Sequence, residues 1–284
     1  MYNRSTQTRS QTQRKRAEST VEWVRNFIRN EREPNDEDFL FASQIDTETL
    51  NHVIEEGPIK GASVAFWLAM SQEGQDLLAH NGFALGSQIH TETLNHVIEV
   101  EPNKGVSVAF WLGVSQEGQA ILAHNDFALG SQITARTLNQ VIEEGPAKGV
   151  SVALWLAGSP EGRALLAHVN PSLVSQITAA TLNYIVPEGK GKGLSVALWL
   201  AVGSEGRALL AHDDFALGSQ ITAATLNHMI EEGPNKGCSV ALWLAGSQTG
   251  QALLAHGNPS LGSQITAETL NHIIEEGPNK GKSV

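Results

Sequence analysis

Apolar side chains recur at helical spacing near the end of the chain, at Leu270, Ile273 and Ile274. Thr266 stands four residues before the first of them and suits the N-cap of such a helix. Gly277 can take the left-handed conformation that ends a helix, and the proline after it blocks continuation. We therefore predict a first helix that begins after Thr266 and ends at Gly277.

Two further helices are predicted from apolar segments in equivalent stretches. Residues 240–245 follow Ser239, a suitable cap, and are apolar on every side, which indicates a helix surrounded by others. A buried strand is the alternative for so short a run, but Ala, Leu and Trp outnumber the β-branched residues. The third helix is predicted after Ser159, because Pro160 suits its first position and paired leucines follow at 165–166.

These helices belong to a unit that recurs every 44 residues. Ser-Gln-Ile opens each copy of the unit, without insertion or deletion, at Ser43, Ser87, Ser131, Ser175, Ser219 and Ser263. A fixed period of this length is typical of repeats that bury their apolar faces against their neighbours. The predicted fold is all-α, a right-handed or curved solenoid of 44-residue, three-helix tandem repeats.

The period divides the chain into four parts. We predict a disordered basic arm at residues 1–18, a degenerate N-terminal capping repeat at 19–42, five tandem helical repeats at 43–262 and a partial sixth repeat at 263–284. The arm has no hydrophobic period and carries bases without acids in its first 17 residues. Because the sixth copy stops where its second helix begins, we expect the chain to be a fragment.

The predicted capping repeat begins with a capping box between Ser19 and Glu22. A shift of one period places Trp23 on Trp67 and Phe39 on Phe83. Its apolar side is formed by Val21, Val24, Phe27 and Ile28. Its other side is made polar, as a terminal repeat requires, by Arg25, Arg29 and Arg32.

Composition restricts the location and chemistry of the chain. The single cysteine, Cys238, allows no disulfide within the chain and favours a reducing compartment. The sequence shows neither a signal peptide nor an apolar run long enough for a membrane span. We expect a cytoplasmic or otherwise intracellular location, with the nucleus as an alternative because of the basic residues 14–16. The formal net charge of −11 disfavours nucleic acid as a partner.

Comparison of the copies separates repeating scaffold positions from candidate contact positions. Paired glutamates stand at the predicted carboxyl end of the first helix, where the dipole disfavours them. Either these glutamates pair with a lysine of the loop or with the neighbouring copy, or they form an acidic ridge that binds a basic partner. The candidate partner-binding residues are these glutamates and a varying position before them: Glu55, Glu56, Glu143, Glu144, Glu231, Glu232, His52, His96, Gln140, Tyr184, His228 and His272.

The fourth copy departs from this pattern. Pro187 replaces the first of its two glutamates, and Lys190 replaces the proline of the loop. We predict that the first helix ends early there and that the array bends.

Catalytic, cofactor and metal sites are not predicted. A histidine ends the third helix of every copy, but equivalent atoms in stacked helices are about 8–10 Å apart, too far to share one zinc ion. The segment from Gly277 to Ser283 resembles a phosphate loop but has one residue too few between its glycines. The paired glutamates recur along the chain without one distinctive copy, which favours a structural role over acid–base catalysis. We therefore expect no enzyme, no cofactor and no small-molecule substrate.

The second and third helices resemble a degenerate ankyrin repeat. The resemblance lies in the segment GVSVALWLAGSPEGRALLAH (149–168), with its Gly-x-Ser opening, apolar first helix, glycine-containing turn and paired leucines. It implies a scaffold that recognises another protein on a concave face.

The first helix and its loop also resemble a transcription-activator-like effector repeat, through Ile-Thr-x-x-Thr-Leu and the closing Ala255-His256-Gly257. This resemblance implies DNA reading through the loops, by Lys60, Lys104, Lys148, Lys192, Lys236, Asn103 and Asn235. We predict a protein-binding scaffold, with DNA binding as the alternative and an accessory region of an enzyme as a remote third.

Overall fold

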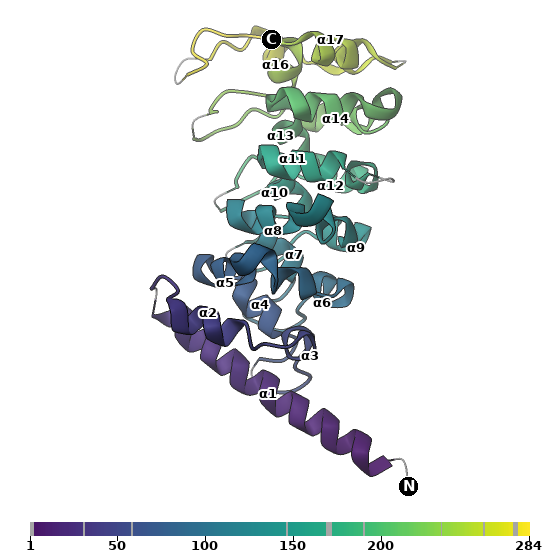
Figure 1. Cartoon of the computed structure of the whole chain (residues 1–284). Helices are drawn as coiled ribbons and strands as arrows, with labels where there is room; N and C mark the ends of the chain where they lie inside the picture. The colour runs from purple at the N-terminus through teal and green to yellow at the C-terminus, as the bar shows by residue number, and fades with distance from the viewer. Residues whose placement is uncertain are drawn as a thin grey trace. The chain divides into compact units, whose positions relative to one another are not determined.

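The computed structural model describes residues 3–30, 32–57, 59–145, 147–168, 172–189, 191–233, 235–257, 259–274 and 278–284. All regular structure within them is helical, with no strand (Figure 1). The chain divides into two compact units, Met1–Thr137 and Leu138–Val284, and each is described by itself. The all-α part of the prediction is confirmed.

The first unit starts with one long helix and continues with short ones. In chain order its helices are α1 (Asn3–Arg29), α2 (Asp36–Ala42), α3 (Thr47–Asn51), α4 (Val64–Ala69), α5 (Gln72–Phe83), the 3-10 helix η1 (Gly86–Gln88), α6 (Thr91–Asn95), α7 (Val108–Val114), α8 (Gln116–Phe127) and η2 (Gly130–Gln132). α9 (Ala135–Asn139) contains the division between the units.

The second unit has the same alternation of short helices and 3-10 turns. Its helices are α10 (Val152–Gly158), α11 (Pro160–Ala167), η3 (Leu173–Gln176), α12 (Ala179–Asn183), α13 (Val196–Val202), α14 (Ser204–Phe215), η4 (Gly218–Gln220), α15 (Ala223–Asn227), α16 (Val240–Ala245), α17 (Gln248–Ala255), η5 (Leu261–Gln264) and α18 (Ala267–Asn271).

The apolar segments form buried central helices, as predicted. Ser239 caps α16 by accepting a hydrogen bond from the Leu242 N–H, and Ser63 caps α4 in the same way. In the first unit α4 packs against α1, α5 and α7, and every residue of α4 except Trp67 is buried. The indole of Trp67 is half-buried and meets the ring of Phe66 edge-on, with 6.0 Å between the centroids.

The third helix of each copy also begins where it was predicted. Ser159 caps α11, and Pro160 occupies its first turn. Gly162 must be glycine, because a Cβ there would lie 2.3 Å from the carbonyl oxygen of Leu156 at the end of the preceding helix. The same close approach fixes Gly74, Gly118, Gly206 and Gly250.

The first helix of each copy is shorter than predicted. α18 begins after the predicted cap Thr266 but ends at Asn271, and Gly277 lies outside the described residues. Ile273 is 59% exposed and Ile274 is buried, so the two do not share one helix face. The glutamates therefore do not stand at a helix end, and the predicted conflict with the helix dipole does not arise. Pro187 shortens nothing, because α12 ends at Asn183, the equivalent position.

A tight hairpin loop replaces the missing turns of helix. In the first copy the Ile54 N–H donates to the Ala62 carbonyl at 3.0 Å, and the Gly61 N–H donates to the Ile54 carbonyl at 2.7 Å. Ile54 is buried, so the residue that closes the loop also anchors it in the core. Equivalent pairs of bonds close the loops at Ile98, Ile142, Val186, Ile230 and Ile274.

The N-terminal arm is helical rather than disordered. α1 runs from Asn3 through Ser19, which therefore caps nothing. Ala17 is fully buried, and the Arg16 guanidinium lies 2.6 Å from the Asp46 carboxylate. The partners that hold this segment, such as Asp46, are distant in the sequence. The composition of the segment alone therefore does not reveal that it is ordered.

The arginines expected on an outer polar face instead make contacts within the first unit. The Arg25 guanidinium lies over the Trp67 ring, 4.9 Å from its centroid. Arg32 donates to both carboxylate oxygens of Asp38, and this hydrogen-bonded pair holds the pKa of the Asp38 carboxyl below its ordinary value. Val21, Val24 and Phe27 are buried as predicted.

One asparagine side chain joins successive copies within each unit. In the second unit the Asn183 amide donates to the Ala179 carbonyl in its own copy and to the Gln220 carbonyl in the next, both at 2.8 Å. Its oxygen accepts from the Thr222 N–H at 2.8 Å. Asn51 and Asn95 in the first unit, and Asn227 in the second, make the same three bonds.

We predict that Asn183→Ala lowers the free energy of unfolding by about 1–3 kcal/mol, because it leaves backbone groups of two copies without partners. Urea unfolding followed by circular dichroism measures this. Asn271→Ala is the matched control, since the Asn271 amide bonds only the Ala267 carbonyl among the described residues. Equal losses in both variants would contradict a joining role for Asn183.

Candidate functional site

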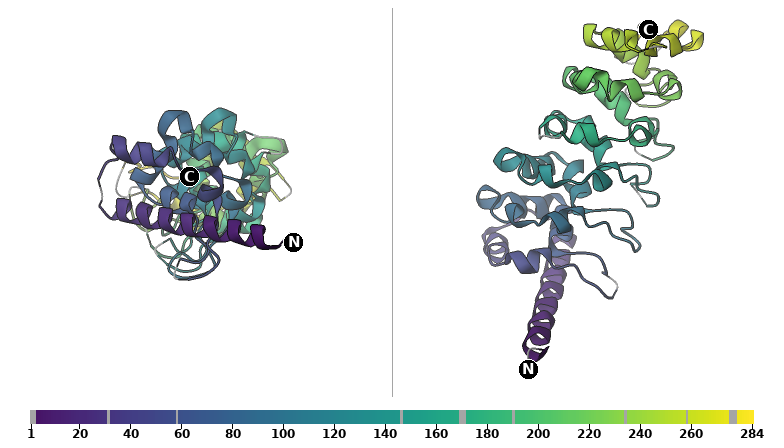
Figure 2. Two further views of the ribbon diagram at one scale, coloured as in Figure 1. Left: turned by 60° about the horizontal axis from the view of Figure 1, so that its bottom comes forward. Right: turned by 90° about the vertical axis from the view of Figure 1, so that its right-hand side faces the viewer.

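The hairpin loops of each unit carry exposed side chains that differ between copies. Figure 2 (right) shows them projecting to one side of the helices in each unit. Their tips carry the glutamates and lysines singled out from the sequence, nearly all of which are exposed. The loops are therefore the candidate contact surface.

The varying position after the first helix lies in the groove between successive loops. A Cβ on Gly61, which has φ +86°, would lie 3.7 Å from His96 Nε2, and one on Gly193 would lie 3.5 Å from His228 Nε2. Tyr184 and His272 pack in the same way on Gly149 and Gly237. These four side chains line grooves. Among the six varying residues His52, His96, Gln140, Tyr184, His228 and His272, only Tyr184 is exposed.

Loop lysines bind glutamates of the following copy in the second unit. Lys192 Nζ lies 3.0 Å from Glu232 and 3.1 Å from Glu231, and Lys148 Nζ lies 2.7 Å from Glu188. Hydrogen bonding to Glu232 and Glu231 raises the pKa of Lys192, and hydrogen bonding from Lys148 lowers the pKa of Glu188. For these pairs a neighbouring copy is the partner, one of the two explanations that the sequence left open.

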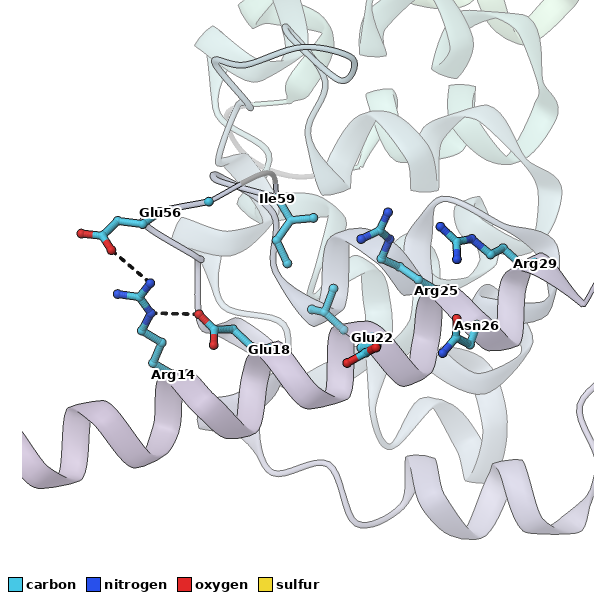
Figure 3. Close-up of a pocket in the computed structure, with 10 residues that line it drawn as sticks. Arg14, Glu18, Glu22, Arg25, Asn26, Arg29, Glu56 and Ile59 are labelled. Carbon is cyan, nitrogen blue, oxygen red and sulfur yellow. Dashed lines mark hydrogen bonds and ion pairs between the residues drawn. The ribbon is translucent and has the colours of Figure 1, made fainter.

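An arginine of α1 takes the place of a loop lysine at the start of the first unit. Arg14 Nη2 lies 3.1 Å from Glu56, and its Nε lies 2.9 Å from Glu18 (Figure 3). These groups border a pocket of about 370 Å³ that also contains Arg25 and Arg29. The sequence could not reveal this arrangement, because an apparently disordered arm gives no reason to place Arg14 beside a loop.

The residues proposed for DNA reading have other contacts. Lys148 and Lys192 are occupied by carboxylates. Asn103 and Asn235 are half-buried, and their carbonyls accept from Val106 and Cys238 to close the loops. Among the residues that the structure describes, Lys60 is a loop lysine without a carboxylate within 4.0 Å.

Three histidines of the column pack on phenylalanine rings. His80 stacks on Phe39 with 4.0 Å between the centroids, and His124 stacks on Phe83 with 4.3 Å. Phe39 and Phe83 thus make the same kind of contact, each with a histidine further along the chain. Within the described ranges no three His, Cys, Asp or Glu residues are grouped as metal ligands. No helix in that part of the chain is long and apolar enough to cross a membrane.

Comparison with known proteins provides no relative. No protein-family model matches the chain, and neither a curated protein nor a solved structure is significantly similar to it. The resemblances to ankyrin and effector repeats therefore stay predictions.

We predict that the Glu188 carboxyl titrates at lower pH than it does in the Lys148→Met variant. The bonded charge of Lys148 favours the carboxylate, so the pair is intact above the ordinary glutamate pKa of about 4.3 and is lost as pH falls through the lowered value. Carbon-detected NMR of the glutamate carboxyls measures the shift. Lys280→Met, a change in another loop, is the control, and an identical Glu188 titration in both variants would show that Lys148 is not its partner.

Proposed function

We propose that the chain is an array of 44-residue, three-helix units stacked as a curved solenoid, and that it binds another protein through its loops. The unbroken sequence period supports the array, as does the recurrence of the same caps, glycines and asparagine bonds inside each unit. The scaffold positions are buried or hydrogen-bonded to one another. What differs between copies is concentrated at the loops and their grooves, and this distribution is typical of a recognition surface.

The observation that carries the proposal is a set of exposed acids without partners. Glu55, Glu99 and Glu143 each lie just after the buried residue that closes a loop. None of the three has an ion pair or side-chain hydrogen bond among the described residues. By contrast, Glu56, Glu188, Glu231 and Glu232 pair with cations of the same chain. The proposed contact for a basic partner is therefore the unpaired set.

DNA binding is the weaker candidate. Nucleic-acid affinity comes largely from cations that neutralise phosphates, and two of the lysines proposed for DNA reading, Lys148 and Lys192, already bind glutamates. A phosphate would have to displace these carboxylates in a strongly acidic chain. The resemblance to effector repeats is what supports this alternative.

We predict that Glu55→Gln/Glu99→Gln/Glu143→Gln reduces capture of the protein's partners from its native extract by about threefold or more, because each exposed charge pair contributes up to about 1 kcal/mol. Quantitative mass spectrometry of the captured proteins provides the measurement. The matched control, Glu48→Gln/Glu92→Gln/Glu268→Gln, removes three exposed glutamates from the short helices and should leave capture unchanged. Unaltered capture by the loop variant would rule out these acids as the contact.

We also predict no association with duplex DNA at low salt, measured by fluorescence anisotropy at two salt concentrations. Electrostatic binding would be strongest at the lower concentration, so that condition is the most permissive. Salt-sensitive binding that is lost on changing Lys60 and Lys104 to Gln would favour the DNA alternative.

A further inference from the structure

The pairing of loop cations with the next copy is interrupted at one step of the first unit. Where this pairing is seen, the cation binds the second glutamate of the following loop: Arg14 with Glu56, Lys148 with Glu188 and Lys192 with Glu232. The second copy has Val100 at that position, although all five other copies have glutamate. Lys60 faces Val100, and no carboxylate of the described residues lies within 4.0 Å of it.

Two pockets allow a direct comparison of the interrupted step with a complete one. The pocket at Lys60 and the pocket at Lys192 are lined by the same eight positions, three periods apart. The Lys60 pocket has a volume of about 320 Å³, twice the roughly 160 Å³ of the Lys192 pocket. Lys192 forms ion pairs with glutamates of the chain itself, whereas Lys60 forms none among the described residues. The pocket beside Lys60 is also the larger of the two.

The walls of the larger pocket define what would fit. Val53, Ile54 and Val100 provide apolar contacts, and Val100 is half-buried where Glu232 is exposed. His96 also lines the pocket and lies against Gly61. An aliphatic stem that ends in a carboxylate matches this combination, because the stem contacts the valines while the carboxylate reaches Lys60. A glutamate side chain has this form.

We propose that the pocket between the first and second loops binds a single glutamate side chain in an extended segment of a partner protein. The inference rests on the proposed function and adds the chemistry of one contact to it. The chain's own pairs at the equivalent positions show the interaction that the partner would reproduce. A phosphate of DNA is disfavoured because Glu55 and Glu99 line the same pocket and would repel a polyanion.

The glutamates on the rim place a second requirement on the partner. A free carboxylate near Glu55 and Glu99 is repelled unless Lys60 lies closer to it than they do. Lys192 accommodates Glu231 and Glu232 together, so a lysine at this position can hold two carboxylates at once. Basic residues on either side of the bound glutamate would pair with Glu55 and Glu99, which are the unpaired acids of the proposed contact.

The test is methyl NMR of the full chain, titrated with the blocked peptide acetyl-Thr-Val-Glu-Val-Thr-amide. The Val53 methyl signals should shift in a saturable manner at millimolar peptide. Lys60→Met should weaken the peptide affinity by about threefold to fivefold, the scale of one exposed ion pair. Val100→Glu should weaken it as much, because it supplies the carboxylate from within the chain. That variant should fold, since glutamate occupies the position in every other copy.

Two controls isolate the lysine and the carboxylate. Lys192→Met removes the matched lysine whose carboxylates are already present, and it should leave the Val53 titration unchanged. A peptide with Gln in place of Glu should bind as weakly to the wild type as the Glu peptide binds to Lys60→Met. The capture experiment tests Glu55, Glu99 and Glu143, whereas the peptide titration tests Lys60 and Val100. Either the proposed function or the proposed glutamate site can therefore fail without the other.

Several outcomes would overturn the proposal. No Val53 shift at millimolar peptide would do so, as would equal affinities in the wild type, Lys60→Met and Val100→Glu. A short DNA duplex that shifts the Val53 signals when the peptide does not would assign the pocket to phosphate instead.

Discussion

The side-chain amide of one asparagine in each copy is the interaction on which the rest of the structure depends. The first helix of a copy has only five residues, too few for a stable helix on its own. Asn95 ends one such helix, bonds the Thr91 carbonyl inside it and bonds both the Gln132 carbonyl and the Thr134 N–H of the next copy. Both donors and the acceptor of the amide are used, so the register between the two copies is fixed by one side chain.

This fixed register lets the loops vary without loss of the fold. The bonds of Asn51 and the buried Ile54 hold the two ends of the first loop. Within the loop, a glutamate can then be replaced by another residue, as it is by Val100 in the second copy and by Pro187 in the fourth. Hydrogen-bonded backbone and buried aliphatic groups carry the stability, because exposed ion pairs such as that of Lys148 with Glu188 contribute little. The charges of the loops are thus available for recognition.

Sequence patterns predicted those elements that local signals specify. Ser239 and Pro160 mark helix starts by local hydrogen bonding and fixed φ, and both were placed correctly. The first helix was overextended because Ile273 and Ile274 also satisfy a helical period. What ends that helix at Asn271 is an extended turn and a hairpin closed by backbone bonds, which leave no pattern in side-chain polarity.

The candidate site was predictable in its residues but not in its pairing. The sequence pointed to the loop glutamates and lysines, yet which of them are paired depends on the distance between successive loops. The role of Arg14 was missed for the same reason, since its partner Glu56 is 42 residues away. Val100 is the exception: its departure from the glutamate of the other copies is visible in the sequence, although its consequence for Lys60 becomes clear only when the loops lie side by side.

The invariant histidine of each copy is explained by packing rather than by chemistry. Asn125, Asp126 and Phe127 all have positive φ, a run of left-handed residues that costs about 1–2 kcal/mol each for ordinary side chains. Asn, Asp and Gly tolerate this conformation best, which accounts for the two residues before Phe83, Phe127 and Phe215. The turn aims Phe83 at His124 of the next copy, and an aromatic pair returns about 0.5–1.5 kcal/mol. That gain does not offset the backbone cost alone, so the turn depends on the helices on either side of it being held in register. Where the connector carries a phenylalanine, the histidine therefore provides an aromatic surface for it to pack on.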